Sequence, residues 1–152
     1  MRINLIAVGR LKSEPEASLA RHFQSRLKWQ VSIREVEEKK NLQPASLRKR
    51  EGELLLASIP KGSVIIALDE KGKNISSRAF AKQLANWRDN SRSEFTFLIG
   101  GVGGLDQTVL DRASLILSLG LMTWPHLLVR GLLFEQLYRA QQILAGHPYH
   151  RE

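Results

Sequence analysis

Three segments in the last third of this 152-residue chain carry residue types that could bind a small molecule and act on it. Four glycines lie in the run Phe95–Gly104, directly after an apolar stretch, where missing side chains let a backbone approach a flat or anionic ligand closely. The run Leu121–His126 (Leu-Met-Thr-Trp-Pro-His) follows and could close on the same ligand. The segment His147–Glu152 (His-Pro-Tyr-His-Arg-Glu) adds titratable and stacking groups. Together they indicate a small-molecule site beside a nucleic-acid site.

Basic residues are concentrated in the first third of the chain. The formal net charge is +8, and residues 1–50 hold twelve Lys and Arg against five Asp and Glu. This concentration favours a polyanionic partner such as RNA, with Arg48, Lys49 and Arg50 as candidate phosphate contacts. The alternative is a basic surface that only keeps the protein soluble.

Composition and length favour one soluble domain spanning residues 1–152. Hydrophobic residues make up 43% of the chain, as in globular proteins. There is no cysteine, which excludes a disulfide framework and a thiolate metal site. The apolar run near the N-terminus is too short for a secretory signal, and no run reaches the roughly 20 residues of a membrane span. We therefore expect a cytoplasmic protein with no membrane and no metal partner.

The elements that must position these groups alternate between strands and helices. Continuous apolar runs are typical of strands buried on both faces, and the residues between them show helical spacing. Ser13 to Glu16 has the spacing of a capping box, and residues 70–73 have the composition of a turn. We expect strands over 2–8, 31–36, 63–69, 94–99 and 115–119, and helices over 15–29, 45–59, 76–90, 106–113 and 126–145. This order predicts an α/β fold with a mainly parallel five- to six-stranded sheet and helices on both faces.

The expected last helix, residues 126–145, is apolar nearly all round. Such a helix either forms a subunit interface, most simply in a two-fold dimer, or lies in the centre of the core. The sequence leaves both alternatives open.

Ligands of open parallel sheets bind at the carboxyl ends of the strands. Leu68-Asp69, Gly100-Gly101 and the loop 120–125 all fall at the carboxyl ends of expected strands, so we expect them to form one pocket with apolar walls and little formal charge. Such a pocket suits a purine ring and a neutral or zwitterionic ligand. The familiar phosphate motifs fit poorly, because Asp106 replaces the third glycine of Gly-x-Gly-x-x-Gly and no P-loop lysine follows. The glycine run alone is also compatible with a plain strand-to-helix turn.

The motifs as a set resemble one family. They are Leu-Ile-Gly-Gly-x-x-Gly-Leu over residues 98–105, Met-Thr-x-Pro-His over 122–126, Val129-Arg130, Glu-Gln-Leu-Tyr-Arg-Ala over 135–140, and the His-Pro-Tyr-His-Arg-Glu tail. Ala7-Val-Gly9 and Leu68-Asp69 match as well. The whole chain closely resembles the ribosomal RNA large subunit methyltransferase H family, within the SPOUT class.

The resemblance implies a single-domain α/β enzyme whose C-terminal segment forms a trefoil knot that holds S-adenosylmethionine. It implies a homodimer that methylates N3 of a pseudouridine in 23S ribosomal RNA, acting on the assembled ribosome. Where family members often carry Leu or Phe, this chain has Trp124, which keeps an apolar wall and narrows the pocket. Carried over by position, the cofactor-binding residues are Leu68, Gly101, Gly120, Leu121, Met122, Thr123, Trp124 and Pro125.

N3 of a pseudouridine must lose its proton before it is a good nucleophile, so the site needs a base or a stabilising cation. The candidates are Arg139, oriented by Glu135 one helical turn earlier, and His150 in the tail. Tyr149 could stack on the extruded base or hydrogen bond to it.

Each candidate has an ordinary structural alternative. Glu135 and Arg139 could form a surface ion pair, and the tail could be disordered. His147 and His150 could ligate a metal, although no third ligand lies nearby in the sequence. His126 could cap the last helix without contacting a ligand.

Two other functional classes compete with the methyltransferase. One is a non-catalytic RNA-binding or ribosome-associated factor, which would not bind S-adenosylmethionine. The other is a nucleotide-binding enzyme of small-molecule metabolism, whose activity would not depend on ribosomes.

Overall fold

The computed structural model describes residues 1–12 and 14–151. Its sheet has five strands in the order β2-β1-β4-β3-β5, and every neighbouring pair is parallel. This confirms the expected parallel α/β sheet and sets its strand number at five. The strands are β1 (Arg2–Val8), β2 (Gln30–Val36), β3 (Val64–Asn74), β4 (Glu94–Ile99) and β5 (Leu115–Ser118).

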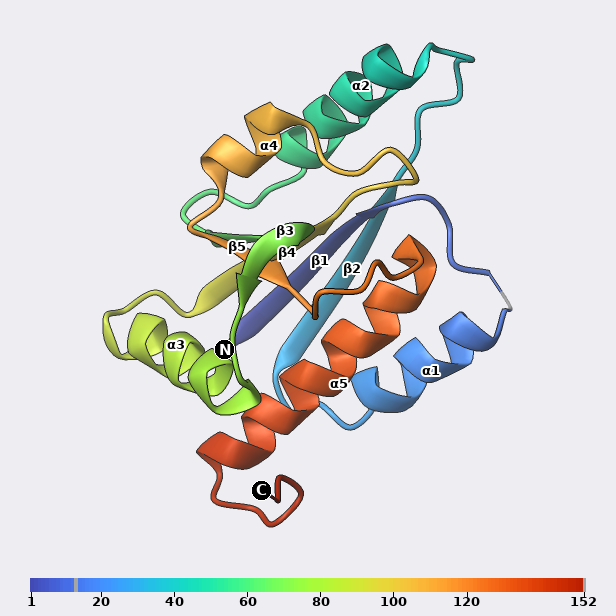
Figure 1. Cartoon of the computed structure of the whole chain (residues 1–152). Coiled ribbons are helices and arrows are strands. Elements are labelled where there is room, and N and C mark those ends of the chain that lie inside the picture. Colours follow the sequence, from blue (N-terminus) through green and yellow to red (C-terminus); the bar gives the residue numbers. More distant parts are fainter. Residues whose placement is uncertain (13, 152) are drawn as a thin grey trace.

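Helices cover both faces of the sheet, as expected. Figure 1 shows α1, α5 and α3 on one face and α2 with α4 on the other. Each face has its own cluster of buried apolar side chains. The trefoil knot implied by the family resemblance stays a prediction. The helices are α1 (Pro15–Gln24), α2 (Pro44–Ala57), α3 (Ser77–Asp89), α4 (Gln107–Arg112) and α5 (His126–Leu144).

The long helix α5 is the central helix of its layer. It packs between α1 and α3 (Figure 1), and Leu133, Phe134 and Leu137 on it are fully buried. This packing shows α5 as a central core helix, and a subunit interface on its partly buried apolar side chains stays a prediction. Packing within one chain accounts for most of the apolar surface of the helix.

Two of the expected boundaries are wrong. Residues 70–73 are not a turn, because β3 continues through them to Asn74 after a shift in its pairing with β5. A Cβ atom on Gly72 would lie 2.7 Å from the Ile116 carbonyl oxygen, so this close crossing of β3 and β5 requires glycine. Helix α1 ends at Gln24, five residues before its expected end, since the backbone N–H of Lys28 donates to Gln141 Oε1 on α5 (2.7 Å).

Side-chain caps begin two of the helices. Ser76 caps α3 by accepting from the Ala79 N–H, and Asp106 caps α4 by accepting from the Thr108 N–H. The sequence predicts Asp106 as the cap of α4 and either Ser76 or Ser77 as the cap of α3, and the structure shows Ser76. Ser13, expected to cap α1, lies outside the described residues.

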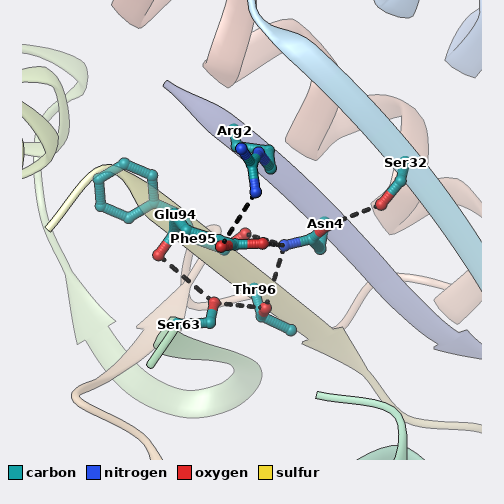
Figure 2. A network of polar contacts seen from close by, with 7 residues as sticks. All are labelled: Arg2, Asn4, Ser32, Ser63, Glu94, Phe95 and Thr96. Carbon is teal, nitrogen blue, oxygen red and sulfur yellow. Dashed lines mark hydrogen bonds and ion pairs between the residues drawn. The ribbon is translucent and has the colours of Figure 1, made fainter. Parts of the chain in front are cut away.

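A polar network fixes the strand register near the amino ends of the strands (Figure 2). Asn4 Nδ2 on β1 donates to Glu94 Oε1 (3.2 Å), and Asn4 Oδ1 accepts from Ser32 Oγ on β2 (2.7 Å). Thr96 Oγ1 on β4 lies 2.6 Å from Ser63 Oγ. A one-residue slip would leave these buried groups without partners, so the network selects this register.

An ion pair between the buried Arg130 and the partly exposed Glu35 connects α5 to β2, the edge strand next to β1. The side chain of Arg130 is 2% exposed and donates to Glu35 Oε2 (2.6 Å) on β2 and to the carbonyl oxygens of Val8 and Gly9. Burial raises the pKa of Glu35, but hydrogen bonds from Arg130 and the Leu11 N–H and the positive charge of Arg130 outweigh burial, so the pKa lies below its ordinary value. The pair holds the start of α5 against the end of β1.

Replacing Glu35→Gln should lower the free energy of unfolding at pH 7 by about 2 kcal/mol, because it leaves the Arg130 charge buried without a counter-charge. The pKa of Glu35 is lower in the folded state than in the unfolded state, where it lies near 4.5. The ionised carboxylate therefore stabilises the fold fully at pH values above 4.5, and this stabilisation is lost as the pH falls through the folded-state pKa. The difference between wild type and variant should therefore shrink below about pH 4.5. Urea unfolding at pH 7 and pH 4 measures both effects.

Glu53→Gln is the matched control, since Glu53 pairs with Arg50 at a site where both side chains are about half exposed. We expect a change below about 1 kcal/mol for it. Equal destabilisation by the two substitutions would contradict the role of the buried pair.

Candidate functional site

The carboxyl ends of β4 and β5, together with residues 68–70 in the middle of β3, surround a cavity of about 400 Å³, here called the first cavity. This volume lies in the range of small-molecule sites. These three segments meet because β4, β3 and β5 are neighbours in the sheet. The lining residues are Leu68–Glu70, Ile99–Leu105, Leu117–Leu119, Met122–His126 and Val129.

The glycine turn after β4 forms one side of the first cavity. The Gly104 N–H donates to the Gly101 carbonyl oxygen (3.0 Å) and closes the turn. A Cβ atom on Gly101 would lie 3.0 Å from Val8 Cγ1 and 3.2 Å from Glu51 Oε2, so a larger residue would push the turn into the cavity. Glycine at this position therefore keeps the cavity open.

The loop between β5 and α5 forms the opposite side. Thr123 Oγ1 donates to Glu70 Oε2 (2.7 Å), which fastens the loop to β3. The indole N–H of Trp124 donates to the Leu119 carbonyl oxygen (3.3 Å). These two bonds set the shape of the loop where it faces the cavity.

The charged side chains of the first cavity are acidic. Asp69 and Glu70 line it, and none of its described lining residues is Lys or Arg. Burial, together with the nearby Arg130 charge, lowers the pKa of His126, so this ring is neutral at pH 7. The expectation of little formal charge is therefore wrong, because two carboxylates make the cavity suitable for a cationic ligand.

The structure brings most of the expected cofactor residues together. Gly120 instead lines a neighbouring cavity, and the side chain of Leu121 is 93% exposed and lines neither. Six of the eight line the first cavity, namely Leu68, Gly101, Met122, Thr123, Trp124 and Pro125.

A second cavity of about 330 Å³ adjoins the first. Both are lined by residues 117–119 and by Trp124, so the two cavities lie next to each other at these residues. The second cavity continues along α5 past Leu132 to Glu135 and Gln136, and α3 contributes Ser77 and Phe80. The sequence suggests no role in a site for Ser77, which it offers only as a possible helix cap, or for Gln136, whose one signal is that it follows Glu135 within the family motif.

The four expected catalytic residues form one cluster at the far end of α5. Arg139 Nε donates to Glu135 Oε1 (3.0 Å), and Arg139 Nη1 lies 3.4 Å from His150 Nδ1. The Tyr149 hydroxyl donates to Glu135 Oε1 (3.3 Å), and the Arg139 guanidinium lies 4.9 Å from the centre of the Tyr149 ring. Burial and the adjacent Glu135 raise the pKa of Tyr149, so the phenol stays protonated. This arrangement orders the tail on α5, as far as Arg151.

The cluster and the first cavity lie at different places along α5. His126 and Val129 line the first cavity, whereas Arg139 is 13 residues beyond His126. At 1.5 Å per residue this separation is about 20 Å along the helix axis. The second cavity lies between them, because Leu132 and Glu135 line it.

The basic residues of α2 differ in how free their side chains are to contact RNA. Arg48 lies beside the glycine turn. The Arg50 guanidinium already pairs with Glu38 (2.9 Å) and Glu53 (3.0 Å). Of the three candidate phosphate contacts, Arg50 is therefore the least available to RNA.

The two tail histidines face other partners. His147 Nδ1 accepts from the Tyr149 N–H (3.2 Å), while His150 Nδ1 faces Arg139. Within residues 1–12 and 14–151, no group of three His, Cys, Asp or Glu side chains is placed to hold a metal ion. In the same part of the chain, no helix has the length and apolarity needed to span a membrane.

Comparisons with known proteins identify the family. Residues 1–150 match the family model described as "Predicted SPOUT methyltransferase". The chain belongs to the SPOUT methyltransferase family. It is 50% identical over 151 residues to ribosomal RNA large subunit methyltransferase H of Rhodospirillum centenum and 52% identical over 151 residues to that of Paramagnetospirillum magneticum. Each alignment covers 99% of both proteins, so within SPOUT the chain is a member of the methyltransferase H family.

Solved structures support the fold of this SPOUT protein. A probable methylase family protein from Haemophilus influenzae aligns over 99% of this chain and 70% of its own length, with a TM-score of 0.59. The SpoU methyltransferase AviRb from Streptomyces viridochromogenes aligns over 95% and 61%, with a TM-score of 0.50. Both are 12% identical, a level at which the likeness concerns the fold alone.

Titration of His126 should give a pKa below 6.5, because burial and Arg130 disfavour its charged form. NMR chemical shifts of the imidazole ring between pH 4 and pH 8, assigned with a His126→Gln variant, measure it. A pKa at or above 6.5 would contradict the placement of this ring in the wall of the first cavity.

Proposed function

We propose that this SPOUT protein is an S-adenosylmethionine-dependent methyltransferase that methylates N3 of a pseudouridine in 23S ribosomal RNA of the assembled ribosome. It acts in the cytoplasm as a homodimer. The observation that carries the proposal is that one helix, α5, borders a ligand-sized acidic cavity at its start and bears the Glu135–Arg139–Tyr149–His150 cluster toward its end. Its relatives are named for methylating ribosomal RNA of the large subunit.

The first cavity suits S-adenosylmethionine. Backbone groups of the glycine turn and of the loop 122–125 offer hydrogen bonds to an adenine and to hydroxyls, and Leu68 and Leu117 provide apolar walls. Asp69 and Glu70 complement the positive charges of the sulfonium and the ammonium group. When bound, the donor supplies a methyl carbon that N3 attacks as the carbon–sulfur bond breaks and its electron pair stays on sulfur.

The cluster supplies what N3 needs to react. Arg139 has no acceptor atom, so His150 Nδ1 faces it with a lone pair. Once the bound base displaces Arg139 from this lone pair, Nδ1 is the proposed acceptor of the N3 proton. The Arg139 charge stabilises the anion left on the ring. Glu135 holds the Arg139 guanidinium in place. The Tyr149 hydroxyl donates to Glu135 and helps to fix that carboxylate, while the Tyr149 ring borders the site.

Exposed apolar side chains favour a homodimer. Val102 and Leu121 are more than nine-tenths exposed and Met122 is 75% exposed, all in loops next to the first cavity. Exposed apolar side chains that gather near a binding site are typical of an interface. A second copy covering these loops would also exclude water from the donor.

Replacing Gly101→Ala should weaken S-adenosylmethionine binding by roughly tenfold or more, because the new Cβ atom meets Val8 and Glu51 and displaces the turn. Gly103→Ala is the control, since its Cβ atom would lie 4.0 Å from its nearest neighbour, Arg48 Cβ. Isothermal titration calorimetry measures both affinities. Equal affinities for the two variants would contradict the assignment of the first cavity.

Arg139→Ala and His150→Ala should lower methylation by roughly 100-fold or more, because general-base and electrostatic effects have this size. Their affinity for S-adenosylmethionine should remain near that of wild type, since neither residue lines the first cavity. Arg88→Ala, which removes an exposed ion pair with Asp89, is the control. A parallel loss of binding and activity would show that the cluster serves only the structure.

Labelled S-adenosylmethionine offered with free RNA, separated subunits and whole ribosomes tests the substrate. We expect label mainly in whole ribosomes, and a rate that falls with added salt because phosphate contacts release counterions. Arg48→Ala should lower the rate at subsaturating ribosome more than Arg50→Ala, since Arg50 is already paired. No label in any sample would favour the non-catalytic RNA-binding factor, and a salt-independent rate would contradict the role of α2.

A further inference from the structure

The second cavity contains polar groups that the mechanism above does not use. Gln136 and Ser77 line it, together with Glu135 from the catalytic cluster. Phe80 and Trp124 provide apolar and aromatic wall, which suits a flat ring. Its volume of about 330 Å³ is at the small end of ligand sites, as expected for one nucleoside.

Two hydrogen bonds fix the orientation of the Gln136 carboxamide. Its Nε2 donates to Glu135 Oε2 (2.7 Å), and its Oε1 accepts from Ser77 Oγ (2.7 Å). A carboxylate only accepts, so the nitrogen of the amide must face Glu135 and the oxygen must face Ser77. The cavity therefore has a carboxamide of known direction in its wall.

This carboxamide keeps one donor and one acceptor open. Among the described residues it makes only the two bonds above, which leaves one N–H on Nε2 and one lone pair on Oε1. An N–H next to a carbonyl oxygen is complementary to an N–H/C=O pair on the edge of a nucleobase.

Glu135 connects this amide to the catalytic cluster. Its Oε2 accepts from Gln136, while its Oε1 accepts from Arg139 and from Tyr149. A base bound beside Gln136 would therefore lie next to the first cavity, at the residues 117–119 and Trp124 that line both cavities, and next to the cluster that includes Arg139.

We propose that Gln136 is a specificity-determining residue that hydrogen bonds the N1–H and C2=O of the target pseudouridine in the second cavity. This inference rests on the proposed function. In pseudouridine the ribose is attached at C5 and N1 carries a hydrogen, whereas in uridine N1 carries the ribose and has no hydrogen to donate. Gln136 Oε1 accepts from N1–H and Nε2 donates to the C2 oxygen. N3–H lies on the other side of that oxygen and stays free to react.

The arrangement penalises uridine. With uridine bound, the open lone pair of Gln136 Oε1 would have no hydrogen-bond donor. A buried polar group without a partner weakens binding, so the affinity for uridine would be much lower than the affinity for pseudouridine. Discrimination between the two nucleosides would thus come from a side chain that takes no part in methyl transfer.

The test compares Gln136→Met with wild type on ribosomes reconstituted with pseudouridine or with uridine at the target position. Methionine keeps the length of the side chain and removes both hydrogen-bonding groups. We expect kcat/KM on pseudouridine to fall roughly 10- to 100-fold, while the low value on uridine and the affinity for S-adenosylmethionine stay unchanged. Gln107→Met is the control, because Gln107 on α4 bonds only to Asp111 at the exposed surface.

A second variant covers the case in which Gln136→Met does not fold. Ser77→Ala frees the amide to rotate but keeps the Ser76 cap of α3, so discrimination should fall by a smaller factor. Equal losses on both substrates, or unchanged discrimination in both variants, would overturn the inference. Equal use of the two substrates by wild type would also overturn it and leave the proposed function standing, whereas no methylation of either would contradict the proposed function itself.

Discussion

The functional architecture depends on the adjacency of β4, β3 and β5 in a parallel sheet. Parallel strands place their carboxyl ends at one edge, so three segments that are separate in the chain, at 68–70, 100–104 and 119–125, meet around one cavity. The Thr123–Glu70 hydrogen bond then fastens the last segment to the first. Without this adjacency the glycine turn and the Thr-Trp-Pro loop would be separate turns with no common ligand.

Helix α5 places the two cavities and the proposed catalytic cluster one after another along its length. Its first turn borders the first cavity, its middle borders the second cavity, and Glu135 and Arg139 bind the tail. The buried Arg130 holds the helix to the ends of β1 and β2, which fixes its position relative to the sheet. One rigid helix thus sets the spacing between the proposed donor, the proposed target base and the groups that remove its proton.

Much of this could be predicted from the sequence, because long apolar runs and glycine turns are strong local signals. The five strands, both side-chain caps and the grouping of Glu135, Arg139, Tyr149 and His150 were expected, and the family resemblance supplied that grouping. The extension of β3 through residues 70–73 was missed because its polar composition is typical of a turn, and only the crossing with β5 makes it a strand. The pairing of Arg50 with Glu38 and the orientation of Gln136 by Ser77 join residues from different elements, so no local pattern could reveal them.

The most direct test of the central claim is a crystal structure of the protein soaked or grown with S-adenosylmethionine. The account predicts density for the ligand between the ends of β3, β4 and β5, in contact with Leu68, Gly101 and the loop 122–125. Density for the ligand at another place on the protein, or no binding at saturating concentration, would contradict it.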